Sequence, residues 1–226
     1  MKGLPGFLIP TLVLAFAGVL IWVFADALAY EPIPRLAEVA AARVPESGVA
    51  NPVTAVLLNF RGYDTLLELA VLLTALLGIW SSGAAAEGFR PAGSVLAAMV
   101  SWLTPLLILT AGYLLWVGGH APGGAFQAGA LLAAAGVLLA LAGDDTAGLP
   151  EEPILRLLIV AGVAAFALVG AGAMAAGLGF LTYPLAVAKW LILFIETAAT
   201  AAIGATLSAA FLGGRPRPRM GRGKRT

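Results

Sequence analysis

The chain has 226 residues, of which 61% are hydrophobic and 11% charged, with a formal net charge of +1 and a mean hydropathy of +0.97. Soluble domains carry about a quarter charged residues, so this composition excludes an ordinary soluble domain and predicts an all-α, polytopic membrane protein. The chain contains no cysteine, which excludes disulfides, cysteine-ligated zinc and iron–sulfur clusters within it. We therefore expect it to hold no cofactor and no metal.

Six transmembrane helices are predicted from apolar runs that approach or exceed the ~20 residues needed to cross a bilayer. They cover residues 6–26, 62–81, 93–117, 124–142, 154–175 and 185–212. The first run is too long for the apolar region of a signal peptide, although the ADALA sequence after it resembles a cleavage site. We therefore expect a retained span.

Between the first two helices lies a polar loop, EPIPRLAEVAAARVPESGVANPVT, in which three prolines precede Pro52. We expect one short helix at about residues 35–43 within an aqueous loop. The apolar stretch that follows, VTAVLLNF, is expected at the membrane interface before the second span.

The second predicted helix begins with charged residues on one face, because Arg61, Asp64 and Glu68 are spaced by three and four residues. Arg61 and Asp64 can pair near the outer boundary of the membrane. Glu68 then lies about 10 Å deeper along the helix, at a depth where ionisable groups are costly and mark functional sites. Two interpretations stay open: Glu68 is a proton or cation site, or it is a structural carboxyl hydrogen-bonded to a neighbouring helix.

The third and fourth predicted helices are joined by GGHAPGGAF, which contains His120, the single histidine of the chain. Pro122 cannot continue the preceding helix, and Gly123 and Gly124 permit a tight turn into the next one. Irregular backbone at membrane depth needs protein or water around it. The motif is therefore either a plain turn with a hydrogen-bonded histidine or a hydrated notch in which His120 titrates.

Small residues recur in the fourth and fifth helices, for example Gly129, four residues after Ala125, and Gly162. Such residues let helix backbones approach closely in lipid, so we expect a tightly packed bundle. In the last helix, Lys189 and Glu196 lie seven residues apart on one face. Glu196 is near the middle of the span, where an unpaired charge is least tolerated, whereas Lys189 is close enough to the outer end to reach water.

The orientation in the membrane is predicted from the basic residues. The C-terminal tail GGRPRPRMGRGKRT is rich in arginine, and with six spans Lys2, Arg90 and Arg156 fall on the same side as this tail. Both termini are therefore predicted to be cytoplasmic. We interpret the tail as a topology signal that contacts anionic lipid, and expect no nucleic acid as a partner.

Two stretches resemble known families. GGHAPGGAFQAGALLAAAGVLLALAG is similar to the GHxxPGGGFxxG signature of the MnhB/MrpB subunits of multisubunit monovalent cation/proton antiporters. PVTAVLLNFRGYDTLLELAVLLTALLGIW is similar to a segment of the large MrpA-type subunit, near its C-terminus, and of the small MbhE-type subunit of membrane-bound hydrogenases. The resemblance implies an MbhE-like two-helix unit at 1–90, an MnhB-like four-helix unit at 91–213 and a basic cytoplasmic tail at 214–226.

The residues that match these family motifs are Arg61, Gly62, Asp64, Thr65, Glu68, His120, Pro122, Gly123 and Gly124. Two positions depart from the motifs: Leu67 replaces the glycine before the glutamate, and Ala125 replaces the third glycine of the second motif. A leucine beside Glu68 affects packing against a partner helix more than the role of the carboxylate. Lys189 and Glu196 have no counterpart in either motif.

The resemblance implies a small multi-pass subunit, not an enzyme, of an Mrp-type Na⁺ or K⁺/H⁺ antiporter in the inner (plasma) membrane. Its partners would be the other subunits, and it would contribute to the ion path and to assembly. Glu68 and His120 are the first ion-path candidates, followed by Asp64, Glu196 and Lys189. Two alternatives stay open: the same module in a redox-driven complex, such as a membrane-bound hydrogenase or complex I-related oxidoreductase, and a purely structural scaffold. In each case we expect no transport by the chain alone.

Overall fold

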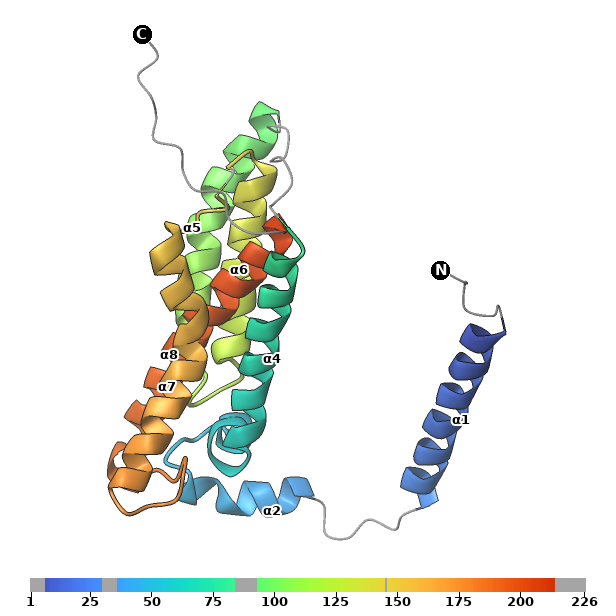
Figure 1. The fold of residues 1–226 in the computed structure, drawn as a ribbon. Helices are drawn as coiled ribbons and strands as arrows, with labels where there is room; N and C mark the ends of the chain where they lie inside the picture. The colour runs from blue at the N-terminus through green and yellow to red at the C-terminus, as the bar shows by residue number, and fades with distance from the viewer. Residues whose placement is uncertain (1–6, 30–35, 84–92, 145, 214–226) are drawn as a thin grey trace. The chain divides into compact units, whose positions relative to one another are not determined.

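A computed structural model describes residues 7–29, 36–83, 93–144 and 146–213. All regular structure within these ranges is helical, which confirms the all-α prediction. The helices are α1 (Leu8–Ala29), α2 (Leu36–Arg43), α3 (Pro52–Ala55), α4 (Gly62–Ser81), α5 (Ser94–Val117), α6 (Ala125–Leu141), α7 (Glu152–Ala175) and α8 (Leu185–Leu212) (Figure 1). A 3₁₀ turn at Val44–Glu46 and a π-helical turn at Val56–Phe60 flank α3.

Five of these helices, α1, α4, α5, α7 and α8, are long and apolar enough to cross a membrane. The fourth predicted span, observed as α6, is also apolar but has only 17 residues. The chain is therefore a multi-pass membrane protein, as predicted. Helix α6 begins at Ala125, within one residue of the predicted bound, and this start is central to the candidate site described below.

The chain divides into two compact units, Met1–Val39 and Ala40–Thr226. In the first unit, none of the 18-residue apolar window of α1 is buried. Its large side chains, including Phe16 and Trp22, are exposed. A helix that is apolar on all sides is typical of a membrane span covered by lipid or by another protein.

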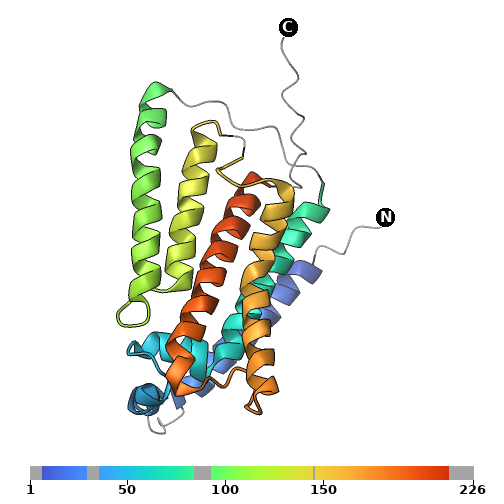
Figure 2. The ribbon, with the colours of Figure 1, turned by 90° about the vertical axis from the view of Figure 1, so that its left-hand side faces the viewer.

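In the second unit, α8 is the central helix and packs against α4, α5, α6 and α7 (Figure 2). Small residues make this possible, as expected from the sequence. A Cβ added to Gly129 of α6 would lie 2.6 Å from Cβ of Ile203, and one added to Gly204 of α8 would lie 2.8 Å from Cβ of Leu132. Helices α6 and α8 therefore pack almost backbone to backbone.

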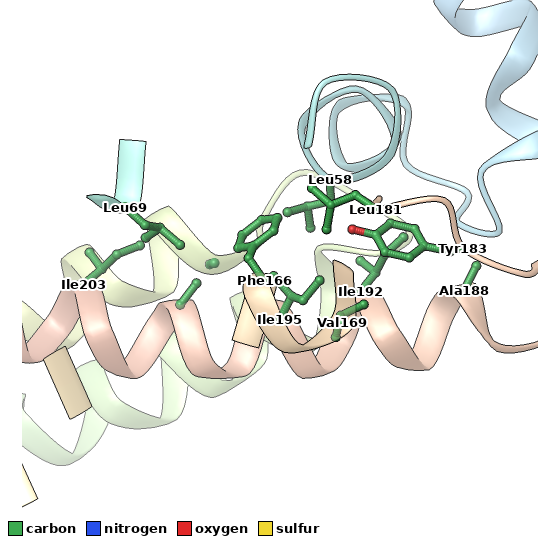
Figure 3. Close-up of a cluster of buried hydrophobic side chains, with 12 residues drawn as sticks. Leu58, Leu69, Phe166, Val169, Leu181, Tyr183, Ala188, Ile192, Ile195 and Ile203 are labelled. Atoms are coloured by element: carbon green, nitrogen blue, oxygen red, sulfur yellow. The ribbon is translucent and has the colours of Figure 1, made fainter. Parts of the chain in front are cut away.

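One apolar cluster joins α4, α7 and α8 near the end of the bundle where α4 and α8 begin (Figure 3). Phe166 of α7 and Ile195 of α8 are completely buried at its centre. Leu58 of the π-helical turn and Leu181 of the α7–α8 loop complete it. The segment that precedes α4 is thus part of the packed core.

The segment before α4 also contacts the start of α8. Gly48 has a φ of +77°, and a Cβ added there would lie 2.6 Å from Cβ of Ala188. Within the segment, Asn59 Nδ2 donates a hydrogen bond of 3.1 Å to the carbonyl of Ser47. The predicted short helix at residues 35–43 is present as α2, and the VTAVLLNF stretch forms most of α3 and the π-helical turn.

Candidate functional site

The loop between α5 and α6, residues 118–124, is clamped by two side chains from the start of α3. Asn51 Nδ2 donates hydrogen bonds to the carbonyls of Gly118 at 2.7 Å and Ala121 at 2.8 Å, and Thr54 Oγ1 donates to Gly118 at 2.6 Å. The backbone N–H groups of Ala50 and Asn51 both donate to the carbonyl of Gly119. These donors satisfy carbonyls that an irregular loop would otherwise leave unpaired.

The glycines of this loop allow the backbone to fold back on itself. A Cβ on Gly118 would lie 2.7 Å from Cα of Gly124, and a Cβ on Gly123 would lie 2.5 Å from the carbonyl oxygen of Leu114. The N–H of Gly124 donates to that same Leu114 carbonyl at 2.9 Å. Side chains at these positions would force the turn open.

Gly124 has a second neighbour, the carboxylate of Glu196 on α8. A Cβ on Gly124 would lie 2.8 Å from Oε1 of Glu196, and Gly124 has a φ of +105°, which favours glycine. Gly124 is also the N-cap of α6 and has no side chain to cap it. The Glu196 carboxylate instead accepts a hydrogen bond from the backbone of Ala125, the first residue of α6.

This contact places the loop deep in the bundle. Glu196 is eleven residues after Leu185, the start of α8, or about 16 Å along the helix. Helix α6 therefore begins beside the middle of α8, and Figure 2 shows the α5–α6 loop set back from the end of α8. Gly48, in the segment before α4, lies against Ala188 in the first turn of α8. Irregular backbone is tolerated at such depth because protein donors surround it.

Glu196 is almost completely buried, with 4% of its surface exposed. Ile192 and Ile195 of its own helix are buried nearby. Thr200, one turn further along α8, donates from Oγ1 to the carbonyl of Glu196 at 2.7 Å. The predicted mid-span carboxylate thus lies inside the chain, at the junction of α6 and α8.

The other residues predicted in the loop and on α8 lie on the surface. His120 and Pro122 are exposed, and no side-chain hydrogen bond of His120 is found within the described ranges. Lys189 is also exposed, with Nζ 5.7 Å from the centre of the Trp190 ring. No ion pair joins Lys189 to Glu196 in the part of the chain that the structure describes.

The charged residues of α4 face outward. Arg61 and Asp64 form an ion pair, with 70% and 44% of their side chains exposed. Glu68 is exposed as well, next to Leu67 and on the same helix as other exposed apolar side chains. Within the described residues it has neither an ion pair nor a hydrogen bond to a neighbouring helix.

Gly62 and Tyr183 meet at the start of α4. A Cβ on Gly62 would lie 3.3 Å from Cδ1 of Leu181 and 4.0 Å from the hydroxyl of Tyr183. Tyr183 lies in the α7–α8 loop, and its hydroxyl is buried without a hydrogen-bond partner among the described residues. Burial raises the pKa of the Tyr183 hydroxyl above its ordinary value.

The sequence reasoning missed Asn51 and Thr54. A signal was available, because Asn51 directly precedes Pro52 and caps α3, accepting from the N–H of Val53 at 3.0 Å. Successive spans also alternate in direction, so the segment before α4 and the loop after α5 are expected at the same end of the bundle. Within the described residues, no group of three His, Cys, Asp or Glu side chains is arranged to hold a metal.

Comparisons with known proteins give one matching family and two similar solved structures. Residues 95–212, slightly more than half of the chain, match the domain related to the MnhB subunit of Na⁺/H⁺ antiporter. No curated protein sequence matches the chain. A chain of the Mrp complex from Dietzia sp. DQ12-45-1b has a similar fold, with a TM-score of 0.66 and 21% identity over 97% of this chain. This chain spans only 27% of that longer one.

A second solved structure is similar over nearly its whole length. It is a chain of the membrane-bound sulfane sulfur reductase, an archaeal respiratory membrane complex, with a TM-score of 0.68 and 25% identity. The similarity covers 90% of this chain and 98% of that chain.

Proposed function

The chain belongs to the family of the domain related to the MnhB subunit of Na⁺/H⁺ antiporter, and on that premise we propose that it is a membrane subunit of a multisubunit Na⁺ or K⁺/H⁺ antiporter of the Mrp type. It works with the other subunits of such a complex, in the plasma membrane, and has both termini in the cytoplasm. It is a transport subunit and not an enzyme. The fold shared with a part of the Mrp complex from Dietzia sp. DQ12-45-1b supports this proposal.

The exposed carboxylate of Glu68 is the single observation that carries the proposal furthest. Glu68 lies about 10 Å along α4 from Arg61, on a helix apolar enough to span the membrane. Lipid cannot solvate a carboxylate at that depth, so the group needs another protein or water beside it. An exposed carboxylate between Leu67 and Val71, both exposed, is therefore expected to face a partner subunit or an ion path between subunits.

We assign Glu68 and His120 as the first ion-path residues, with Asp64, Glu196 and Lys189 as further members. The exposure of His120 and Lys189 suits residues that exchange ions with water or a partner. Arg61, Gly62, Pro122, Gly123 and Gly124 are structural. The close contacts of Gly62, Gly123 and Gly124 and the ion pair of Arg61 support that assignment.

A second candidate is an ion-moving membrane module of a redox-driven complex. The similarity to a chain of the sulfane sulfur reductase, over almost the whole of that chain, favours it. In that case the ion path would be the same, but electron transfer in other subunits would drive it. Mass spectrometry of the copurified subunits separates the two, because redox partners carry cluster-binding cysteines.

The experiment for the first proposal replaces Glu68 with glutamine in the assembled complex. Glu68→Gln keeps the size of the side chain and removes its charge, so we expect normal assembly on native gels and loss of cation/proton exchange in inside-out vesicles. Thr74→Val is a matched control, because Thr74 is an exposed polar residue on the same helix that cannot ionise. Normal exchange by the Glu68 variant would contradict the ion-path assignment and leave a scaffold role.

A further inference from the structure

We propose that Glu196 is a proton-binding site of this chain, built where α6 begins against the middle of α8. The Glu196 carboxyl would take up and release one proton as the complex works. This inference rests on the proposed function, because a buried proton site serves the chain only if the assembled complex moves protons.

The charged form of Glu196 is supported by the start of α6. The first N–H groups of a helix lack partners within it, and the helix dipole is positive there. The Glu196 carboxylate accepts a hydrogen bond from the backbone of Ala125 at this point, and Gly124 leaves space for it. An N-terminus that receives a carboxylate from a different helix thus holds the anion in place.

The neutral form is supported by burial. Only 4% of Glu196 is exposed, and its neighbours Ile192, Ile195 and Ala199 on α8 are buried as well. Taking a carboxylate out of water is unfavourable unless it is well paired, and a protonated carboxyl avoids that cost. Since each protonation state has its own support, the group can change state without a large rearrangement.

A helix cap alone does not require an ionisable group. Asn, Ser and Thr are good capping residues without a charge. A glutamate is a costly choice at mid-membrane. Its presence at this junction therefore indicates a use for its proton.

No basic residue neutralises Glu196 within the described residues. Helix α6 has no titratable side chain, and Tyr113 of α5 is exposed. On α4, Asp64 pairs with Arg61 and Glu68 is exposed, and on α7 Arg156 pairs with Glu152. No ion pair links Glu196 to any of these groups or to His120.

The α5–α6 loop gives the proton a short way in. Gly124 lies against the carboxylate, and the outer part of the same loop, at His120 and Pro122, is exposed. Because Gly124 has no side chain, the Glu196 carboxylate lies directly against the backbone of this loop.

The test uses the purified complex and its Glu196→Gln variant. The glutamine oxygen can still accept from Ala125, so the cap is kept while the exchangeable proton is lost. In pH-difference infrared spectra we expect the unmodified complex to show a carboxyl C=O band that is missing from the variant. In vesicles we expect the variant to lose proton-coupled transport. Identical infrared spectra for the two complexes would overturn the proposal and leave Glu196 as a structural cap.

The two readouts separate this inference from the proposed function. A Glu196 band in a complex without cation/proton exchange would refute the antiporter but keep the proton site. Cation/proton exchange by a complex without a Glu196 band would support the antiporter and refute the proton site. If Glu196→Gln does not assemble, dicyclohexylcarbodiimide, which modifies protonated carboxyls in apolar surroundings, is applied to the unmodified complex. Labelling of Glu196 that falls as the pH rises supports the site, and no labelling at any pH where the complex is intact overturns it.

Discussion

The carboxylate of Glu196 occupies the space that a side chain at position 124 would need, since a Cβ on Gly124 would lie 2.8 Å from Oε1 of Glu196. The two residues are far apart in the sequence and belong to different helices, α8 and the start of α6. The contact with Glu196 is a second reason, besides the tight turn, for a glycine at position 124 of the GGHAPGGAF motif. The last glycine of the motif is the residue that lets α6 begin directly on a buried carboxylate.

A first prediction compares two glycines of this motif. Gly124→Ala places a Cβ against Glu196 and demands an unfavourable φ of +105°, for which strain of about 1–3 kcal/mol is expected. We expect a lower apparent Tm of the detergent-purified complex and reduced transport. Gly119→Ala is the control, because a Cβ there meets nothing within 4 Å. Equal effects of the two substitutions would contradict the importance of the contact.

The sequence was sufficient to predict where the helices lie. Runs of apolar residues place the predicted spans 62–81 and 185–212 at the observed bounds of α4 and α8, because length and hydropathy alone determine a membrane span. The pairing of Gly124 with Glu196 could not be predicted, because it depends on how far α6 is displaced along α8. Hydropathy contains no information on such a displacement.

A second prediction concerns the clamp on the α5–α6 loop. Asn51→Ala removes the donor to the carbonyl of Ala121 and one of the donors to that of Gly118. A buried carbonyl left unpaired costs about 1–3 kcal/mol, so we expect a lower Tm and faster hydrogen exchange in residues 118–124.

Thr54→Val provides the comparison for this clamp. It removes one donor to the Gly118 carbonyl, which Asn51 still satisfies, so its effect should be smaller than that of Asn51→Ala. A larger effect of the Thr54 change would mean that Asn51 does not hold the loop.

A third prediction follows from the buried hydroxyl of Tyr183. Because burial raises its pKa above the ordinary 10.0, the folded protein holds this proton more tightly than the unfolded chain does. The resulting stability is fully present below about pH 10 and is lost as the pH rises further. Tyr183→Phe should make the apparent Tm less dependent on pH in that alkaline range. At neutral pH the variant should be equally or slightly more stable, since an unpartnered hydroxyl is removed. A Tm that falls with alkaline pH equally in both proteins would contradict this.

A fourth prediction separates structure from transport at Asp64. Its ion pair with Arg61 is largely exposed, and exposed pairs contribute about 0–1 kcal/mol. Asp64→Asn should therefore leave the Tm nearly unchanged. If transport nevertheless falls, Asp64 acts on the ion path; if both are unchanged, its part in the path is rejected.

The last prediction concerns topology and uses the absence of cysteine from the chain. Single cysteines at Glu46 and Glu151, both exposed and at opposite ends of the helices of the second unit, should be labelled by membrane-impermeant maleimide from opposite sides. The neighbouring Ser47 is unsuitable for labelling because its side chain is completely buried. The positive-inside rule assigns the Glu151 side to the cytoplasm, since Arg156 and the end of α8 are on that side and the basic sequence 215–225 follows α8. In inside-out vesicles we therefore expect labelling at position 151 and none at 46 until the membrane is permeabilised. The opposite pattern would invert the orientation, and labelling of both from one side would contradict the spans of α4 to α8.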